Sequence, residues 1–294
     1  MRFRLVEGFA KGDNIMRTSW TMRAGAVTAL LLALLASPAP VWAQQPDADA
    51  RAAAASQAAH LAKQTQNPVS SLISVPFQGN WDMGIGDREA TGTLLNFQPV
   101  VPFGITPSTN VILRVIMPLA SQPAADGTRV NALGDIVMSA FFSPAASGKV
   151  IWGVGPVLLL PTATNNALGA EKFGIGPSVV VLTQPGPWTV GLLFNQIWSV
   201  SGATDRKDVN QTYLQPFLNY NLNHGLALGV VMEATANWNA DQAWTAPLLF
   251  GVSKVAMLGK RPVNFQFLAG PMVASPDGGA NWRFRFATTF MFPR

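Results

Sequence analysis

The stretch from Asn281 to Phe292 restricts the fold more than any other part of the sequence. Aromatic side chains and one threonine occupy its even positions: Trp282, Phe284, Phe286, Thr288, Phe290 and Phe292. Two arginines and three other residues occupy its odd positions: Arg283, Arg285, Ala287, Thr289 and Met291. Because successive residues of a β-strand point to opposite faces, one face would be a column of aromatic rings and the other would carry both arginines. In a soluble β-sandwich the rings would lie in a core, whereas in an outer-membrane barrel they would face lipid and the arginines would face the lumen.

The same alternation of apolar and polar residues recurs along the chain from Leu72 onward. Eleven further stretches follow it, although the one at Phe173–Thr183 is apolar on both faces; they begin near Ile73, Thr93, Val111, Gly134, Trp152, Phe173, Trp188, Leu214, Leu228, Trp244 and Val263. Tight turns rich in Pro, Gly and Asn alternate with longer polar connections, as periplasmic turns alternate with extracellular loops in outer-membrane barrels. We therefore predict an all-β protein in which residues 71–294 form an antiparallel up-and-down transmembrane β-barrel of about twelve strands.

The composition favours this barrel over a soluble β-sandwich or a lipocalin-like barrel. Charged residues make up 12% of the chain and hydrophobic residues 49%. The charged share is about half of that in a typical soluble domain, and a soluble barrel would need more charge on its outer face. Prolines inside several predicted strands are the feature that fits least well, because each removes a ladder donor.

The first 43 residues predict a signal peptide. Arg23 precedes the apolar run Ala24–Ala36, and Val41-Trp42-Ala43 places a small residue before the expected cleavage site. An uncleaved anchor helix is the alternative, although Pro38 and Pro40 follow the run closely. Removing residues 1–43 takes away five of the 20 basic and two of the 15 acidic side chains, which leaves a net charge of +2. No basic patch remains, so we expect no nucleic-acid partner.

Residues 44–70 predict a short, partly helical N-terminal segment. The alanine-rich stretch Asp47–Lys63 favours a helix, and Asn67-Pro68 ends this pattern. The segment is interpreted as a plug or a periplasmic arm, or else as a weakly ordered lead-in to the barrel. The lead-in is favoured because chain termini are usually loose.

Six charged side chains are predicted to face the lumen and to line a pore: Asp82, Arg114, Asp135, Glu233, Arg283 and Arg285. Opposite charges in a narrow barrel would pair with one another, because buried charges need partners. Alternatively, they would form a constriction that selects polar or zwitterionic solutes. The chain has no cysteine and two histidines, His60 and His224, neither of which is expected to reach a central site. We therefore predict no catalytic site, no metal site and no cofactor.

Several stretches of the chain resemble a known family of proteobacterial outer-membrane barrels. They include Leu61–Gln78 (LAKQTQNPVSSLISVPFQ), Asn96–Pro102 (NFQPVVP), Trp152–Pro156 (WGVGP), Pro161–Thr164 (PTAT) and Asn195–Ser199 (NQIWS). This pattern is similar to that of the MetA-pathway-of-phenol-degradation family of outer-membrane transporters, and the likeness runs from Leu61 to the C-terminus. The resemblance implies the bacterial outer membrane as the location and a link with the uptake of aromatic compounds. It brings no catalytic residue with it.

Together these observations predict a porin-like channel or transporter that passes small molecules, with aromatic or apolar solutes as candidates. The alternative is a non-conducting barrel with a structural or envelope-interaction role. The expected partners are outer-membrane lipid, a small-molecule solute and the barrel-assembly machinery. The sequence sets no oligomeric state.

Overall fold

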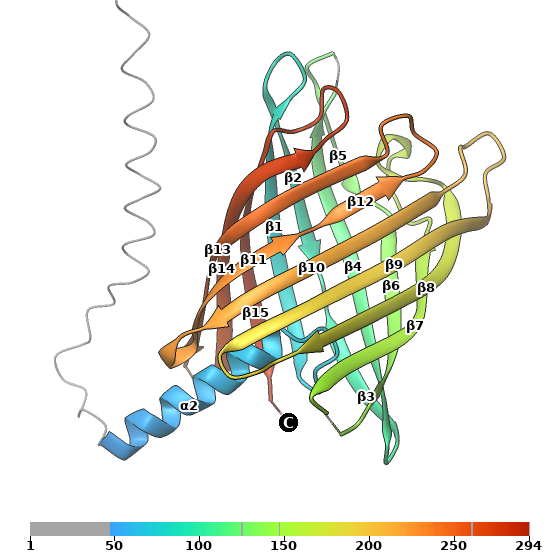
Figure 1. Ribbon diagram of the computed structural model, residues 1–294. Helices are drawn as coiled ribbons and strands as arrows, with labels where there is room; N and C mark the ends of the chain where they lie inside the picture. Colours follow the sequence, from blue (N-terminus) through green and yellow to red (C-terminus); the bar gives the residue numbers. More distant parts are fainter. Residues whose placement is uncertain (1–47, 125, 147, 260, 294) are drawn as a thin grey trace, which may run out of the picture. The chain divides into compact units, whose positions relative to one another are not determined.

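The computed structural model describes residues 48–124, 126–146, 148–259 and 261–293. The predicted signal peptide and its cleavage site lie outside the described residues. The described chain begins with helix α2 (Ala48–Thr65) and continues as strands joined by turns and two short 3-10 helices, η1 (Asn166–Leu168) and η2 (Asn223–Gly225) (Figure 1). The strands are β1 (Ile73–Ile85), β2 (Ala90–Phe97), β3 (Val100–Thr106), β4 (Thr109–Pro123), β5 (Arg129–Leu133), β6 (Ile136–Pro144), β7 (Val150–Leu160), β8 (Lys172–Thr183), β9 (Trp188–Gly202), β10 (Asn210–Asn221), β11 (Leu226–Met232), β12 (Ala234–Asn237), β13 (Trp244–Leu258), β14 (Arg261–Ala274) and β15 (Trp282–Phe292).

These strands form one closed antiparallel barrel. Successive positions in the wall pair antiparallel, and β15 returns to pair with β1 from Ile73↔Phe292 to Met83↔Trp282. Three positions in the wall are each made of two segments, namely β2 with β3, β5 with β6, and β11 with β12, so that fifteen segments fill twelve positions. The predicted fold class and strand number are confirmed.

Prolines account for two of these interruptions. The break between β2 and β3 falls at Pro99, which has no N–H to donate, although its carbonyl still accepts from the Val115 N–H at 3.1 Å. The break between β11 and β12 falls at Glu233, beside Pro216 on β10 and Pro247 on β13. Glu233 retains one ladder bond, from its N–H to the Pro247 carbonyl at 3.2 Å. The strand prolines therefore interrupt the hydrogen-bond ladder locally without changing the barrel.

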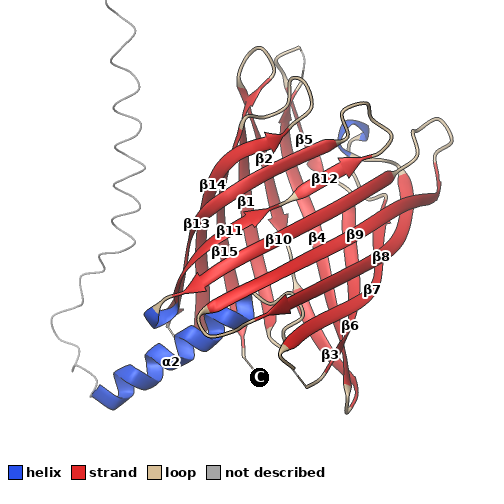
Figure 2. Ribbon diagram, viewed as in Figure 1, coloured by secondary structure: helices blue, strands red, loops and turns tan. Residues whose placement is uncertain are grey.

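The two ends of the barrel differ. Figure 2 shows the tight turns, helix α2 and the end of β15 at one end, and the longer loops at the other. In outer-membrane barrels the short turns are periplasmic and the long loops extracellular. We therefore call the end that carries α2 the periplasmic end.

The outer face of the wall is apolar, as the alternation predicts. Large hydrophobic side chains on it are well exposed, among them Val154, Val181, Leu218, Phe250 and Phe286. The seven tryptophans predicted near strand ends are all exposed: Trp81, Trp152, Trp188, Trp198, Trp238, Trp244 and Trp282. Trp238 and Trp244 meet edge to face, with ring centroids 5.7 Å apart. A membrane-facing surface needs such an apolar band with aromatic residues at its borders.

Residues 61–72 pack into the periplasmic end of the barrel. Val69 belongs to a buried cluster with Ile112, Phe141, Val180, Leu182 and Leu193 from the wall. Leu61, Ala62 and Leu72 form a second cluster with Val255 and Met291. These contacts differ from the weakly ordered lead-in favoured from the sequence, because Leu61, Val69 and Leu72 give the segment apolar anchors that its alanines do not. None of the helices in the described part of the chain has the length and apolar character of a transmembrane helix.

Candidate functional site

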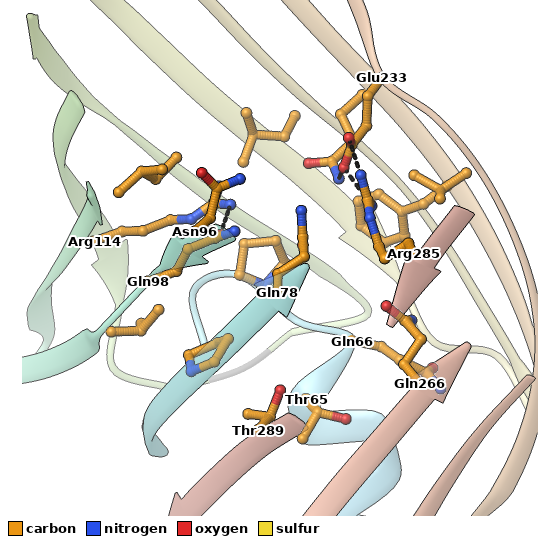
Figure 3. A pocket seen from close by; sticks show the side chains of 18 of the residues that line it. Thr65, Gln66, Gln78, Asn96, Gln98, Arg114, Glu233, Gln266, Arg285 and Thr289 are labelled. Atoms are coloured by element: carbon orange, nitrogen blue, oxygen red, sulfur yellow. Dashed lines mark hydrogen bonds and ion pairs between the residues drawn. The ribbon is translucent and has the colours of Figure 1, made fainter. Parts of the chain in front are cut away.

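The barrel encloses a chamber of about 470 Å³. Its floor is made by residues of the N-terminal segment, including Gln64, Gln66 and Ser70. Its walls carry many amide side chains: Gln78, Asn80, Asn96, Gln98, Asn195, Gln211, Gln215, Asn219, Asn264 and Gln266. Three arginines and one carboxylate also line it, namely Arg114, Arg283, Arg285 and Glu233. Figure 3 shows Arg114, Arg285 and Glu233. The volume falls within the roughly 300–1,000 Å³ of small-molecule sites.

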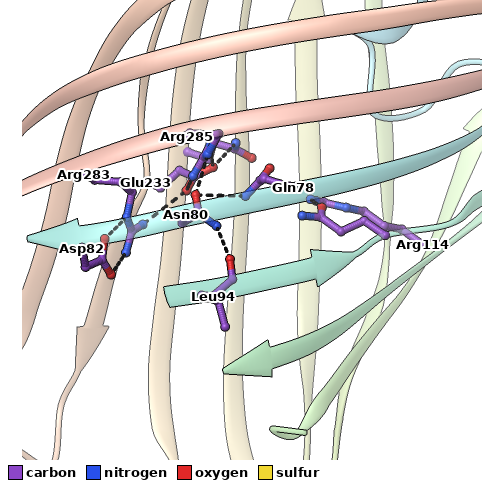
Figure 4. A network of polar contacts seen from close by, with 10 residues as sticks. Gln78, Asn80, Asp82, Leu94, Arg114, Glu233, Arg283 and Arg285 are labelled. Atoms are coloured by element: carbon purple, nitrogen blue, oxygen red, sulfur yellow. Dashed lines mark hydrogen bonds and ion pairs between the residues drawn. The ribbon is translucent and has the colours of Figure 1, made fainter. Parts of the chain in front are cut away.

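Four of the charged residues predicted to line a pore come together in one network (Figure 4). Arg283 donates two hydrogen bonds to the Asp82 carboxylate, at 2.6 and 2.8 Å. Both terminal nitrogens of Arg285 donate hydrogen bonds to the Glu233 carboxylate, one of them to Oε1 at 2.8 Å. Arg283 also lies 3.8 Å from Glu233, which joins the two pairs. Two-pronged contacts of this kind between arginine and carboxylate are strong and directional.

The register of the strands that close the barrel creates this network. Asp82 lies directly opposite Arg283, and Asn80 directly opposite Arg285, in the β1–β15 ladder. The Arg285 Nε donates to the Asn80 side-chain oxygen at 2.7 Å. Glu233 reaches the pair from the break between β11 and β12, and Gln215 donates to it at 3.1 Å. The first and last strands are thus joined by side chains as well as by the backbone ladder.

Arg114 lies across the chamber from the network. One of its terminal nitrogens donates to the Gln98 side-chain oxygen at 2.9 Å. Among the described residues, no carboxylate forms an ion pair with it. Figure 3 shows Arg114, Gln98 and Asn96 gathered on one side, with Arg285 and Glu233 on the other. The side-chain oxygen of Asn96 is buried and has no hydrogen-bond partner within the described chain.

Two of the six predicted residues do not line the chamber. Asp82 binds the guanidinium of Arg283 but is not among the residues that line the chamber. Asp135 also lies outside the lining; its carboxylate accepts from the N–H groups of Ala163 at 3.1 Å and Ala170 at 2.6 Å. Asp135 therefore anchors the loop between β7 and β8 to the extracellular end.

A second charged group, not singled out in the sequence, lies at the extracellular end. Lys172 is buried at the start of β8, and its ammonium lies 3.0 Å from the Asp208 carboxylate in the loop between β9 and β10. The same carboxylate accepts from the Ser199 hydroxyl at 3.1 Å. The Lys172 ammonium, followed by the Ser199 hydroxyl, holds the pKa of Asp208 below its ordinary value of 3.8. Lys172 belongs to a polar stretch that predicts a loop, so the sequence carries no signal for this pair.

The floor is fastened to the wall by amide contacts. Gln66 and Asn221 exchange two side-chain hydrogen bonds, at 2.9 and 3.2 Å. The Gln184 side chain donates to the Lys63 carbonyl at 2.9 Å, and the Lys63 ammonium reaches the Gly186 carbonyl. The attachment of the N-terminal segment to the wall by Gln66 and Lys63 was not predicted from the sequence. The polar residues at the end of the alanine-rich helix are the signal that could have suggested it.

The arrangement is suited to binding and passage. In the part of the chain that the structure describes, no group of three or more His, Asp or Glu side chains is placed to hold a metal ion. His60 and His224 are exposed and do not line the chamber. The chamber can offer a small solute hydrogen bonds, apolar surface and the guanidinium of Arg114, which has no ion-pair partner among the described residues.

Comparisons with known proteins identify the fold. No family model matches the chain, and no curated protein matches it in sequence. An outer-membrane channel from Pseudomonas putida F1 is similar in structure, with a TM-score of 0.57 and 14% identity over 75% of this chain and 94% of that one. The NanC porin gives a TM-score of 0.47 at 13% identity, over 75% of this chain and 100% of the porin. The outer membrane phospholipase A of Escherichia coli gives 0.42 at 11% identity, over 76% of this chain and 98% of the enzyme.

The first of these structures has the same barrel fold. Together with the closed wall and its apolar outer face, this likeness places the protein among outer-membrane β-barrels, in the outer membrane of a bacterium. The resemblance to the phenol-degradation family stays a prediction.

Proposed function

We propose that this protein is a channel through which small molecules pass passively across the outer membrane. The observation that carries the proposal is the polar chamber of about 470 Å³ inside a wall whose outer face is apolar. A barrel whose only task is structural has no need of a cavity of this size lined by amides and arginines. Passage down a concentration gradient needs neither a cofactor nor a catalytic group.

In this proposal the charged residues of the lumen line the path. Arg114, Glu233, Arg283 and Arg285 border the chamber itself. Asp82 holds Arg283 in place, and Asp135 shapes the loop between β7 and β8 near the extracellular mouth. The proposed partners are the lipid around the apolar belt, the barrel-assembly machinery and the solute.

The N-terminal segment predicted at residues 44–70 serves as a periplasmic floor in this proposal. Its described part, from Ala48 onward, supplies Leu61 and Val69 to the two apolar clusters and Gln66 to the chamber. Solutes that leave the chamber on this side must displace residues 64–70. The proposal therefore includes an equilibrium between a closed floor and an open one.

The non-conducting alternative also has an observation in its favour. The apolar clusters around Leu61 and Val69 pack residues 61–72 against the wall at the periplasmic end, which is the arrangement that a barrel closed at this end would have. If the floor never opens, the protein is a structural barrel whose helix α2 is available to other envelope components.

Single-channel recording separates the two functions. The mature chain would be refolded, shown to be folded by its heat-dependent mobility in gel electrophoresis, and inserted into planar bilayers. Discrete and reproducible conductance steps, absent when heat-unfolded protein is added, are the result that the channel predicts. A folded and inserted chain that stays silent over a wide range of voltages would contradict the channel and support the structural role.

A further inference from the structure

The chamber contains one positive charge that no carboxylate among the described residues pairs with. In the network, Arg283 and Arg285 face Asp82 and Glu233, so two cations meet two anions. Both guanidinium groups hold a carboxylate with two nitrogens each. Arg114 has Gln98 as its hydrogen-bond partner and no carboxylate in the described part of the chain.

The surroundings of Arg114 are built from neutral hydrogen-bonding groups. Gln78 lies opposite Asn96 in the β1–β2 ladder, and Gln98 follows on the same face. Asn96 and Gln98 are both buried, and the Asn96 oxygen has no partner within the described residues. An arginine with unused donors beside neutral amides is suited to an incoming anion, because a guanidinium offers five N–H groups in a planar fork that fits a carboxylate.

The opposite wall of the chamber carries apolar side chains among its amides. Strands β9, β10 and β11 lie six positions away from β1, β2 and β4 in a ring of twelve, so they face them across the lumen. Leu193 and Ile197 on β9, Phe217 on β10 and Val231 on β11 contribute to this wall. A solute held by Arg114 at one end would therefore rest an apolar body against these side chains.

We infer that the chamber is a binding site for small organic monocarboxylates with an apolar body, held through Arg114. The inference rests on the proposed channel function and names its class of solute. One negative charge balances the single excess cation, whereas a dianion would leave an uncompensated charge beside Glu233. The guanidinium fork can bind a carboxylate through two parallel hydrogen bonds, and inorganic phosphate has no apolar body to rest on the opposite wall.

Binding to the folded mature protein in detergent tests the inference without requiring conduction. Isothermal titration at neutral pH would compare benzoate, acetate, benzyl alcohol and inorganic phosphate. We expect benzoate to bind at least about tenfold more tightly than benzyl alcohol, which has the same ring without the charge, and more tightly than acetate, which lacks the ring. Equal affinity for benzoate and benzyl alcohol, or tighter binding of phosphate than of benzoate, would overturn the inference.

Variants of Arg114 locate the site. Arg114→Gln removes the charge and should weaken benzoate binding by about tenfold or more. Arg114→Lys keeps the charge without the planar fork, so its affinity for benzoate should lie between those of the native protein and Arg114→Gln. Arg129→Gln is the matched control, because Arg129 is exposed at the extracellular end and bonds to Ser121 and to the Thr91 carbonyl. It should bind benzoate like the native protein. If Arg114→Gln does not fold, the inference is tested by the affinity of Arg114→Lys for benzoate and by the comparison of the four ligands on the native protein.

The two proposals fail in different ways. A chain that conducts ions but shows no preference for benzoate overturns the carboxylate site alone. A chain that binds benzoate through Arg114 yet never conducts retains the site and loses the channel.

Discussion

At the scale of single residues, the side chains between β1 and β15, the two strands that close the barrel, combine structural and functional roles. Asp82 and Asn80 lie opposite Arg283 and Arg285, and Glu233 completes the network from the break between β11 and β12. Arg285 is 2% exposed, so losing its partner would leave a charge with little water around it. Removing one member of a buried pair is therefore costly, whereas removing both is much less so.

We expect Glu233→Gln and Arg285→Gln each to lower the free energy of unfolding by about 3 kcal/mol, because each leaves one buried charge without its partner. The double variant should lose clearly less than the sum of the two losses. Urea unfolding in lipid vesicles, followed by tryptophan fluorescence, measures these values. Arg129→Gln, at an exposed site, should stay within about 0.5 kcal/mol of the native protein. Strictly additive losses at Glu233 and Arg285 would mean that the two side chains do not interact.

The Asp208–Lys172 pair predicts a local dependence on pH. Because the pKa of Asp208 in the folded protein lies below 3.8, the pair stabilises the extracellular loop above that pH. The stabilisation is lost as the pH falls through the lowered pKa. Carbon NMR of the labelled Asp208 carboxyl should therefore give a pKa below 3.8, and Lys172→Gln should raise it. An unchanged pKa in the variant would show that Lys172 does not cause the shift.

At the scale of elements, the strands and the helical start of the N-terminal segment were predictable, whereas the packing of that segment was not. Alternation placed most of the twelve strand positions, since each strand has a lipid face and a lumen face and a shift by one residue would invert them. Even β8, apolar on both faces in the sequence, lies in the wall. The packing of Leu61 and Val69 could not be predicted, because their partners Val255 and Phe141 are distant in the chain.

The candidate site was predictable in part. The parity of β15 assigned Arg283 and Arg285 to the lumen, yet their pairing depends on contacts with Asp82 and Asn80, 201 and 205 residues away. The alternation of residues around Asp135 also predicted that its side chain faces the lumen. In the structure, the loop between β7 and β8 folds back onto its carboxylate instead. Such loop geometry leaves no periodic signal in a sequence.

The floor of the chamber leads to a prediction for Val69. Val69→Ser removes an apolar contact with the cluster around Phe141, and burial of a valine stabilises by roughly 1.5–3 kcal/mol. If this stabilisation is present in the closed floor alone, the open fraction should rise by about tenfold or more. Single-channel recording measures the open probability. Val200→Ser changes an exposed residue on the outer face and should leave the open probability unchanged, and an equal rise in both variants would argue against a role of Val69 in closure.

At the scale of the whole molecule, twelve strands suit a barrel that is neither filled nor widely open. Barrels of about eight strands are filled by side chains, and those of 16–18 strands leave an aqueous channel. A lumen between these limits can hold a chamber and still be closed by one short segment. The apolar outer belt with its tryptophans holds this assembly in lipid.

Phe286→Arg tests the orientation of the wall. Phe286 is on the outer face near the middle of β15, where an arginine facing lipid should cost roughly 2–4 kcal/mol. Its fraction folded in vesicles, measured by gel mobility, should fall well below that of the native chain, while Phe286→Leu should fold normally. Normal folding of Phe286→Arg would mean that the even face of β15 does not contact lipid.

The proposal that solutes pass the floor formed by residues 64–70 is tested most directly by linking this floor covalently to the wall. The chain has no cysteine, so Gln66→Cys with Asn221→Cys provides the two thiols at a contact between the N-terminal segment and the end of β10. A bifunctional methanethiosulfonate would join them, and a reductant would cleave the link. We expect tethering to abolish the single-channel conductance, reduction to restore it, and each single variant to conduct normally under the same treatment. A tethered chain that conducts like the untethered one would show that solutes do not pass the floor formed by residues 64–70.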